Sequence, residues 1–133
     1  MSKALLIAGG ILNTVAFFFH LMLGFQIRHL SQVAQPHRAI MEALNVGVAL
    51  SIFFFAYVSL FHGKELLATC LGRVVLVLVS LFYLSRAAEE FFLFQFTPAI
   101  FVSCLLVGAV YAALLVLALK ENRQPVGTAE TSR

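Results

Sequence analysis

The residue in this sequence best suited to ligand or proton chemistry is a histidine inside a long apolar segment. His20 lies seven residues before Ile27, where that segment ends, which places the imidazole roughly 10 Å below one membrane surface if the segment is a spanning helix. Ionisable side chains within a membrane are rare and usually functional. Three interpretations stay open: a neutral histidine bonded to a neighbouring polar side chain, a contact to a ligand or proton path, or a ligand of metal or haem.

Polar side chains at a similar depth occur in the second and third apolar segments. They predict a ligand-binding cluster of four residues: His20, Asn45, Ser80 and Tyr83. The predicted rim of this cluster is charged and consists of Glu42, Arg86 and Glu90. Since Arg86 stands three and four residues before Glu89 and Glu90, one helix face can hold both ion pairs, and we expect a solvated helix end there rather than an acid/base pair.

A haem held by two histidines of one chain needs both at the same depth on facing helices. His29 is half a turn out of phase with His20, His37 lies in a predicted loop, and His62 lies at the opposite membrane face. A metal site built from His29, His37 and Glu42 lacks compact ligand spacing, so no metal ligand is predicted. The candidate cofactors that remain are a quinone or a haem shared with a partner chain.

The composition indicates that these residues lie in a lipid bilayer and not in water. Of 133 residues, 62% are hydrophobic and 11% are charged, with a mean hydropathy of +0.99, whereas soluble domains have about 25% charged residues. Nucleic-acid binders, disulfide scaffolds and soluble enzymes are therefore excluded. The apolar residues form four segments long enough to cross a bilayer, at 4–27, 43–61, 66–85 and 99–119.

Short connections between these segments force neighbouring helices to run antiparallel, which predicts an all-α, up-down-up-down four-helix membrane bundle over residues 1–119. Pro36 is expected to keep residues 28–42 in a loop, and residues 62–65 to form a tight turn. Thr97 is the expected N-cap of the last helix, with Pro98 at its first position. The polar tail at 120–133 is expected to be disordered.

Small and polar residues at helical spacing mark the faces expected to point inward. In the four segments, in order, these are Gly9, Asn13, Phe17, His20 and Gly24; Glu42, Asn45, Ala49, Ile52, Ala56 and Ser59; Thr69, Arg73, Leu76, Ser80, Tyr83, Ala87 and Glu90; and Cys104, Gly108, Tyr111 and Ala112. Arg73 is a buried charge on this pattern, and we expect its long stem to reach the membrane surface near Glu65. Cys70 and Cys104 are interpreted as packing residues.

The distribution of Lys and Arg predicts the orientation. One side carries five of them, Lys3, Lys64, Lys120, Arg123 and Arg133, and the other carries three, Arg28, Arg38 and Arg86. Both termini are therefore expected in the cytoplasm of a bacterial-type inner membrane.

The segment Pro36-His37-Arg38-Ala39 through Asn45, with Gly72-Arg73 through Tyr83 and Arg86, resembles in part the membrane-associated eicosanoid and glutathione metabolism family. That resemblance implies a trimeric transferase binding glutathione through Arg38, Asn45, Arg73 and Tyr83. Here Glu42 precedes Asn45 and no proline follows, which departs from the family's order. His37-Arg38 with Met41 is also similar to the opening of small four-helix proteins near terminal-oxidase assembly, but the later histidines of that pattern are absent.

The function that these observations favour is non-enzymatic. We expect an accessory subunit or small-ligand binding protein, for a quinone or a proton, that works as a homo-oligomer or within a larger membrane complex. A membrane-embedded glutathione-type transferase and a small oligomeric transporter remain as alternatives.

Overall fold

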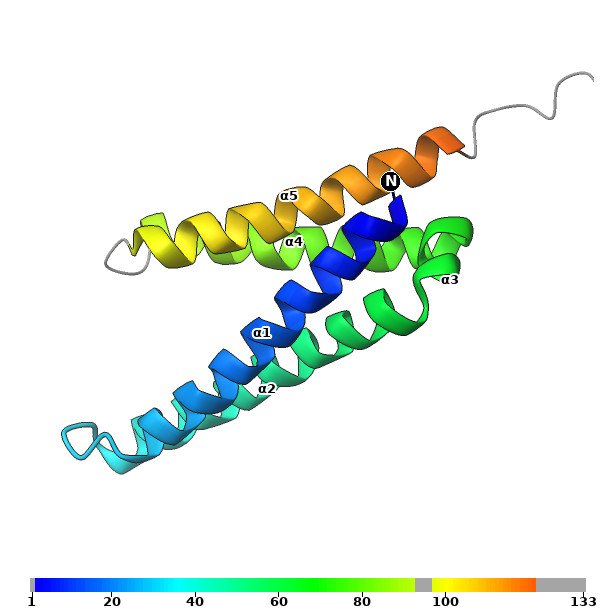
Figure 1. Cartoon of the computed structure of the whole chain (residues 1–133). Helices are drawn as coiled ribbons and strands as arrows, with labels where there is room; N and C mark the ends of the chain where they lie inside the picture. The colour runs from blue at the N-terminus through cyan, green and yellow to red at the C-terminus, as the bar shows by residue number, and fades with distance from the viewer. Residues whose placement is uncertain (1, 93–96, 122–133) are drawn as a thin grey trace, which may run out of the picture. The chain divides into compact units, whose positions relative to one another are not determined.

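The computed structural model describes residues 2–92 and 97–121, and this part of the chain is helical and contains no strand (Figure 1). Its helices are α1 (Ser2–Arg28), α2 (Gln35–Phe61), α3 (Gly63–Ala68), α4 (Cys70–Phe92) and α5 (Pro98–Glu121). All but the short α3 are long and apolar enough to cross a membrane, which confirms the prediction of four such helices. Most of the predicted disordered tail, residues 122–133, lies outside the described residues.

The chain divides into two compact units, and the first of them, Leu6–Gly63, is built by α1 and α2. We call this pair the first hairpin. The rings of Phe17 and Phe53 lie 5.4 Å apart between centroids, and Nδ1 of His20 lies 2.8 Å from Oδ1 of Asn45. The later residue of α1 contacts the earlier residue of α2, so the two helices are antiparallel.

The second unit comprises residues 1–5 with Lys64–Arg133, and α4 and α5 form its long hairpin, here called the second hairpin. The Ser80 hydroxyl donates to the carbonyl oxygen of Gly108 at 3.1 Å. The rings of Phe91 and Phe101 meet edge to face at 5.1 Å between centroids. These contacts make α4 and α5 antiparallel, as the short connections predict, while the assembly of both hairpins into one bundle stays a prediction.

The start of α2 differs from the sequence prediction. Helix α2 begins at Gln35, so the predicted loop at 28–42 is wrong over its second half. Pro36 lies in the first turn of α2, where a proline costs nothing because the N–H groups of that turn have no intrahelical partner. The proline therefore starts this helix instead of excluding it.

The third apolar segment is also divided differently. The predicted turn at 62–65 is mostly the helix α3, and the predicted span at 66–85 is interrupted at Thr69 and then continues to Phe92. The Thr69 hydroxyl accepts a hydrogen bond from the N–H of Gly72 at 2.9 Å, so Thr69 is the N-cap of α4. The same hydroxyl donates to the carbonyl oxygen of Glu65 at 2.8 Å, which ties the end of α3 to the start of α4.

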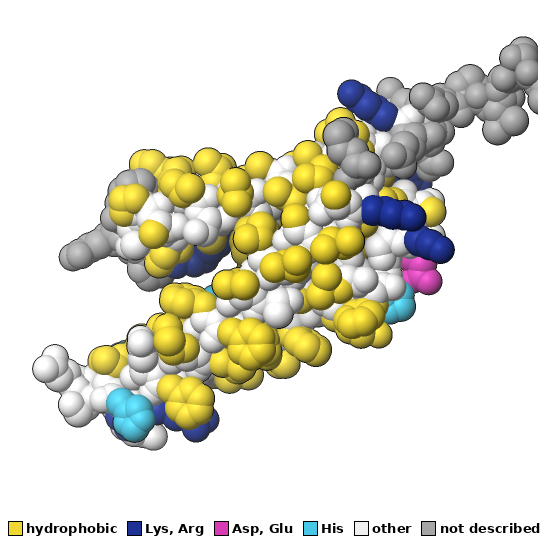
Figure 2. All heavy atoms as spheres, in the orientation of Figure 1, with side chains coloured by type: hydrophobic (Ala, Val, Ile, Leu, Met, Phe, Trp, Pro, Cys, Tyr) yellow, Lys and Arg dark blue, Asp and Glu magenta, His cyan; other side chains and the backbone are white. Residues whose placement is uncertain are grey.

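The inward faces follow the predicted spacing in large part. The buried residues that were predicted are Gly9, Asn13, Ala49, Ile52, Ala56, Ser59, Leu76, Ser80, Tyr83, Ala87, Glu90, Gly108 and Tyr111. Thr69 is exposed, in keeping with its role as a cap. Figure 2 shows hydrophobic side chains along the visible length of the helices and charged side chains gathered toward their ends.

Candidate ligand-binding groove

A groove of about 320 Å³ runs between the two helices of the first hairpin. The residues that line it are Phe17, His20, Leu21, Gly24, Phe25, Arg28, Glu42, Asn45, Val46, Ala49 and Leu50. Its volume lies at the lower end of the range of small-molecule pockets. The lining is mostly apolar, with a short polar row in it, so the groove suits a ring-sized head with a few polar atoms.

His20 and Asn45 form a reciprocal pair inside this groove. Nδ2 of Asn45 donates to the backbone carbonyl oxygen of His20 at 2.9 Å, while Oδ1 of Asn45 lies 2.8 Å from Nδ1 of His20. Two hydrogen bonds hold the amide, and the second of them also fixes the orientation of the imidazole. Half of the predicted four-residue cluster is therefore brought together.

The close approach of Asn45 to α1 depends on Gly24, one turn beyond His20. A Cβ atom at position 24 would lie 3.1 Å from Nδ2 of Asn45, which is tighter than most real contacts of a methyl group. The glycine therefore leaves room for the Asn45 amide to reach the backbone of α1. The spacing of His20 and Gly24 by four residues places both on one helix face.

An ion pair closes one end of the polar row. Nε of Arg28 lies 3.6 Å from a carboxylate oxygen of Glu42, with side-chain exposures of 69% and 32%. Glu42 was predicted as a rim residue, whereas Arg28 was interpreted only as a loop charge. Arg28 follows His20 and Gly24 at the same spacing of four residues, so the sequence could have predicted that it lies on the same face of the helix.

Ser80 and Tyr83, the other two predicted ligand residues, belong to the second hairpin. Ser80 donates to a carbonyl oxygen of α5, and Tyr83 is buried with its ring 5.3 Å from that of Phe82. A single cluster of all four residues stays a prediction. Within the first hairpin, His20 and Asn45 already make a candidate site without them.

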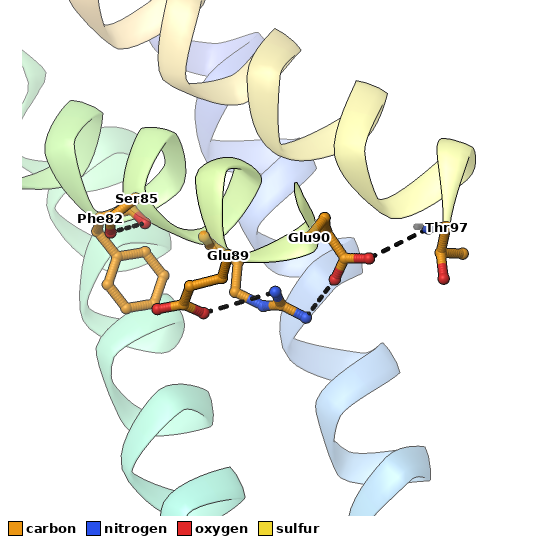
Figure 3. A network of polar contacts seen from close by, with 6 residues as sticks. Phe82, Ser85, Glu89, Glu90 and Thr97 are labelled. Atoms are coloured by element: carbon orange, nitrogen blue, oxygen red, sulfur yellow. Dashed lines mark hydrogen bonds and ion pairs between the residues drawn. The ribbon is translucent and has the colours of Figure 1, made fainter. Parts of the chain in front are cut away.

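The charged group at the end of α4 is not the solvated helix end that the sequence predicts (Figure 3). The Glu90 side chain is 2% exposed, and its two oxygens serve two partners: Nη2 of Arg86 at 2.7 Å and the N–H of Thr97 at 3.3 Å. Glu89 lies 3.5 Å from Nη1 of Arg86 and is 44% exposed. Only Glu89 fits the prediction, because Glu90 turns toward the start of α5.

The role of Glu90 is to join two helix ends. The carbonyl oxygen of Thr97 accepts from the N–H of Phe101 at 3.0 Å, and Pro98 is the first residue of α5, so Thr97 occupies the predicted N-cap position. The carboxylate satisfies the N–H of this cap residue and lies at the positive end of the α5 dipole. Glu90 thus links the end of α4 to the start of α5, and Arg86 pairs with the same carboxylate.

The remaining singled-out residues do not join the groove. Arg73 is half-buried on α4, and Arg38 donates to the carbonyl oxygen of Leu30 at 3.4 Å, close to the start of α2. Cys70 is exposed and Cys104 half-buried, and both are free thiols. Within residues 2–92 and 97–121 no group of three His, Cys, Asp or Glu side chains is placed to hold a metal ion.

Comparison of the chain with models of known protein families, with curated proteins and with solved structures gives no match.

Proposed function

We propose that this chain is an integral protein of a bacterial-type cytoplasmic membrane that binds the polar head of a lipid-soluble ligand, a quinone, in the groove of the first hairpin. The observation that carries the proposal is the His20–Asn45 pair. It presents an oriented imidazole in an apolar groove of about 320 Å³. Ionisable side chains within membrane-spanning segments are rare and usually mark functional sites.

The surroundings of the pair favour a ligand that arrives from the lipid. Large hydrophobic side chains of the lining are exposed on the helix surfaces, among them Leu21, Phe25, Val46 and Leu50. A tail of a membrane-soluble molecule can lie along these side chains while its ring occupies the groove. Both termini are proposed to lie in the cytoplasm, because the cationic side chains are more numerous on that side.

The proposed role is that of an accessory subunit of a larger membrane complex or of a homo-oligomer. One chain of 133 residues has little room for a reaction path of its own, and such paths are commonly built between subunits or repeats. Gentle detergent purification tests this role, with absorption spectrum, quinone extraction and mass measured on the same peak. Co-purified quinone supports the proposal. A haem spectrum from a co-purified partner subunit supports the accessory role as well, whereas a quinone-free trimer that transfers glutathione overturns the proposal.

His20→Leu is expected to weaken binding of the reduced ligand, a quinol, by about tenfold, because the hydrogen bond between its hydroxyl group and the imidazole is lost. The matched control is His29→Leu, the same change at an exposed histidine outside the groove. Binding of a short-chain quinol to the purified protein in detergent is measured by anaerobic equilibrium dialysis, with circular dichroism to check that both variants keep their helices. Equal affinity of the His20 variant and the wild type contradicts the proposed site.

Gly24→Leu is expected to reduce binding by a similar factor, because the new side chain displaces the Asn45 amide and fills the groove. Gly47→Leu is the control, since a Cβ atom at position 47 meets nothing within 4 Å. The same dialysis measurement separates the two variants. If both bind like the wild type, the ligand lies elsewhere than in this groove.

A further inference from the structure

The contacts of Asn45 determine which nitrogen of His20 carries the proton. A backbone carbonyl oxygen can only accept a hydrogen bond, so the atom of Asn45 that lies 2.9 Å from the His20 carbonyl oxygen must be the amide nitrogen. The other atom, Oδ1, is then an acceptor. Because Oδ1 lies 2.8 Å from Nδ1 of His20, that ring nitrogen must be the donor and must bear the hydrogen.

The second ring nitrogen is thereby an acceptor in the neutral imidazole. With the proton held on Nδ1, Nε2 carries a lone pair. Within residues 2–92 and 97–121, Nε2 of His20 accepts no hydrogen bond, and the ring lines the groove. A ligand head in the groove therefore meets an acceptor at this position, and its best complement is a hydroxyl group.

We propose that the groove selects the reduced, hydroxyl-bearing form of its ligand, a quinol, over the oxidised quinone. This inference rests on the proposed function and specifies the redox state of its ligand. A quinol O–H donates to Nε2, whereas a quinone carbonyl would bring its lone pairs against the lone pair of Nε2. The proton can move to Nε2 to meet the carbonyl only if the Nδ1–H bond to Asn45 is given up, so quinone binding costs one hydrogen bond.

The other polar groups of the groove do not offset this preference. The Arg28 guanidinium and the amide hydrogens of Asn45 are donors, and they can meet an oxygen of either form, because hydroxyl and carbonyl oxygens both accept. Arg28 also stands eight residues beyond His20, roughly 12 Å along the helix. The Glu42 carboxylate is also an acceptor, but it is paired with Arg28 at the end of the polar row. The difference between quinol and quinone beside His20 therefore arises at Nε2.

Preferential binding of the quinol also makes the bound quinone easier to reduce. Reduction of the quinone takes up two electrons and two protons. Because the product binds more tightly than the quinone, reduction of the bound molecule is more favourable than reduction of the free one. One hydrogen bond to an otherwise unpaired acceptor corresponds to a preference of about tenfold, which for a two-electron couple equals about 30 mV. The groove of the proposed accessory subunit would then be occupied mainly by the reduced ligand.

The test compares three probes under anaerobic conditions in detergent: tetramethyl-1,4-benzoquinone, its quinol and the dimethyl ether of that quinol. The ether keeps the reduced ring but lacks both O–H donors. The wild-type protein is expected to bind the quinol about tenfold more tightly than either other probe. Quinone or ether bound as tightly as the quinol, together with about tenfold weaker binding of the probes to His20→Leu, overturns the inference and leaves the proposed function standing.

Two variants test the mechanism of the preference. Asn45→Leu frees the imidazole to place its proton on Nε2, so the preference is expected to fall to within about twofold while quinone binding persists. His20→Gln offers both a donor and an acceptor, and the same loss of preference is expected. Ser51→Ala is the control, because among the described residues its hydroxyl bonds only the Gly47 carbonyl oxygen of its own helix. If Asn45→Leu keeps the tenfold preference for the quinol, Asn45 does not fix the proton on Nδ1 of His20. If none of the three probes binds the wild-type protein, the proposed function is overturned as well.

Discussion

Glu90→Gln is expected to lower the free energy of unfolding by about 1.5–3 kcal/mol, the range for a hydrogen bond to a charged group. The carboxylate is 2% exposed and uses one oxygen for Arg86 and the other for the N–H of Thr97. A glutamine has a single acceptor oxygen, so its NH₂ group must face either the guanidinium or the backbone N–H. One of these two donors then loses its acceptor oxygen on residue 90, and the ion pair with Arg86 at 2.7 Å is lost.

The matched control for this change is Glu89→Gln on the same turn. Glu89 lies 3.5 Å from the same guanidinium but is 44% exposed, and exposed ion pairs contribute about 0–1 kcal/mol. Unfolding is followed by circular dichroism while sodium dodecyl sulfate is added to the protein in a mild detergent. If both variants unfold at the same sodium dodecyl sulfate fraction, Glu90 is not the tie between α4 and α5 that its contacts indicate.

Gly72→Ala is expected to cost about 1–3 kcal/mol of stability, as overpacking of a tight contact does. A Cβ atom at position 72 would overlap the backbone of Glu65 and Leu66, the residues of α3 that pack on the start of α4. A side chain can rotate away from such an overlap, but a backbone cannot. The α3 helix would have to move, and the bonds of the Thr69 hydroxyl to both helices would be strained.

Gly47→Ala serves as the control for this prediction. Position 47 is also a helical glycine, but the added methyl group meets nothing within 4 Å. The change should therefore stabilise the protein by up to about 1 kcal/mol through helix propensity. The same detergent titration measures both variants, and a Gly72 variant as stable as the wild type would show that α3 is free to shift.

Much of the local structure was predictable. Four long helices follow from the lengths of the apolar segments, and the buried faces of α2 and α4 follow from small and polar residues at steps of three and four. Both signals depend only on residue type and helical geometry. The start of α2 was mispredicted because Pro36 reads equally well as a helix breaker and as a first-turn residue.

The break at Thr69 was missed for a related reason. Its hydroxyl can bond within a continuous helix or cap a new one, and the choice depends on where α3 packs. The close contact of the α3 backbone with Gly72 requires a bend between α3 and α4. A glycine seven residues after Glu65 is no sequence signal by itself.

The sequence by itself determined the solvent of this protein, the four apolar helices and the presence of an ionisable ring within one of them. Only the tertiary structure decided which polar groups meet between helices: His20 with Asn45, and Glu90 with the N–H of Thr97 at the start of α5. Hydropathy is a sum over neighbouring residues and can be read along the chain. Which polar side chains meet between helices depends on how the packed helices are rotated and tilted. That arrangement is set jointly by many contacts between residues far apart in the sequence.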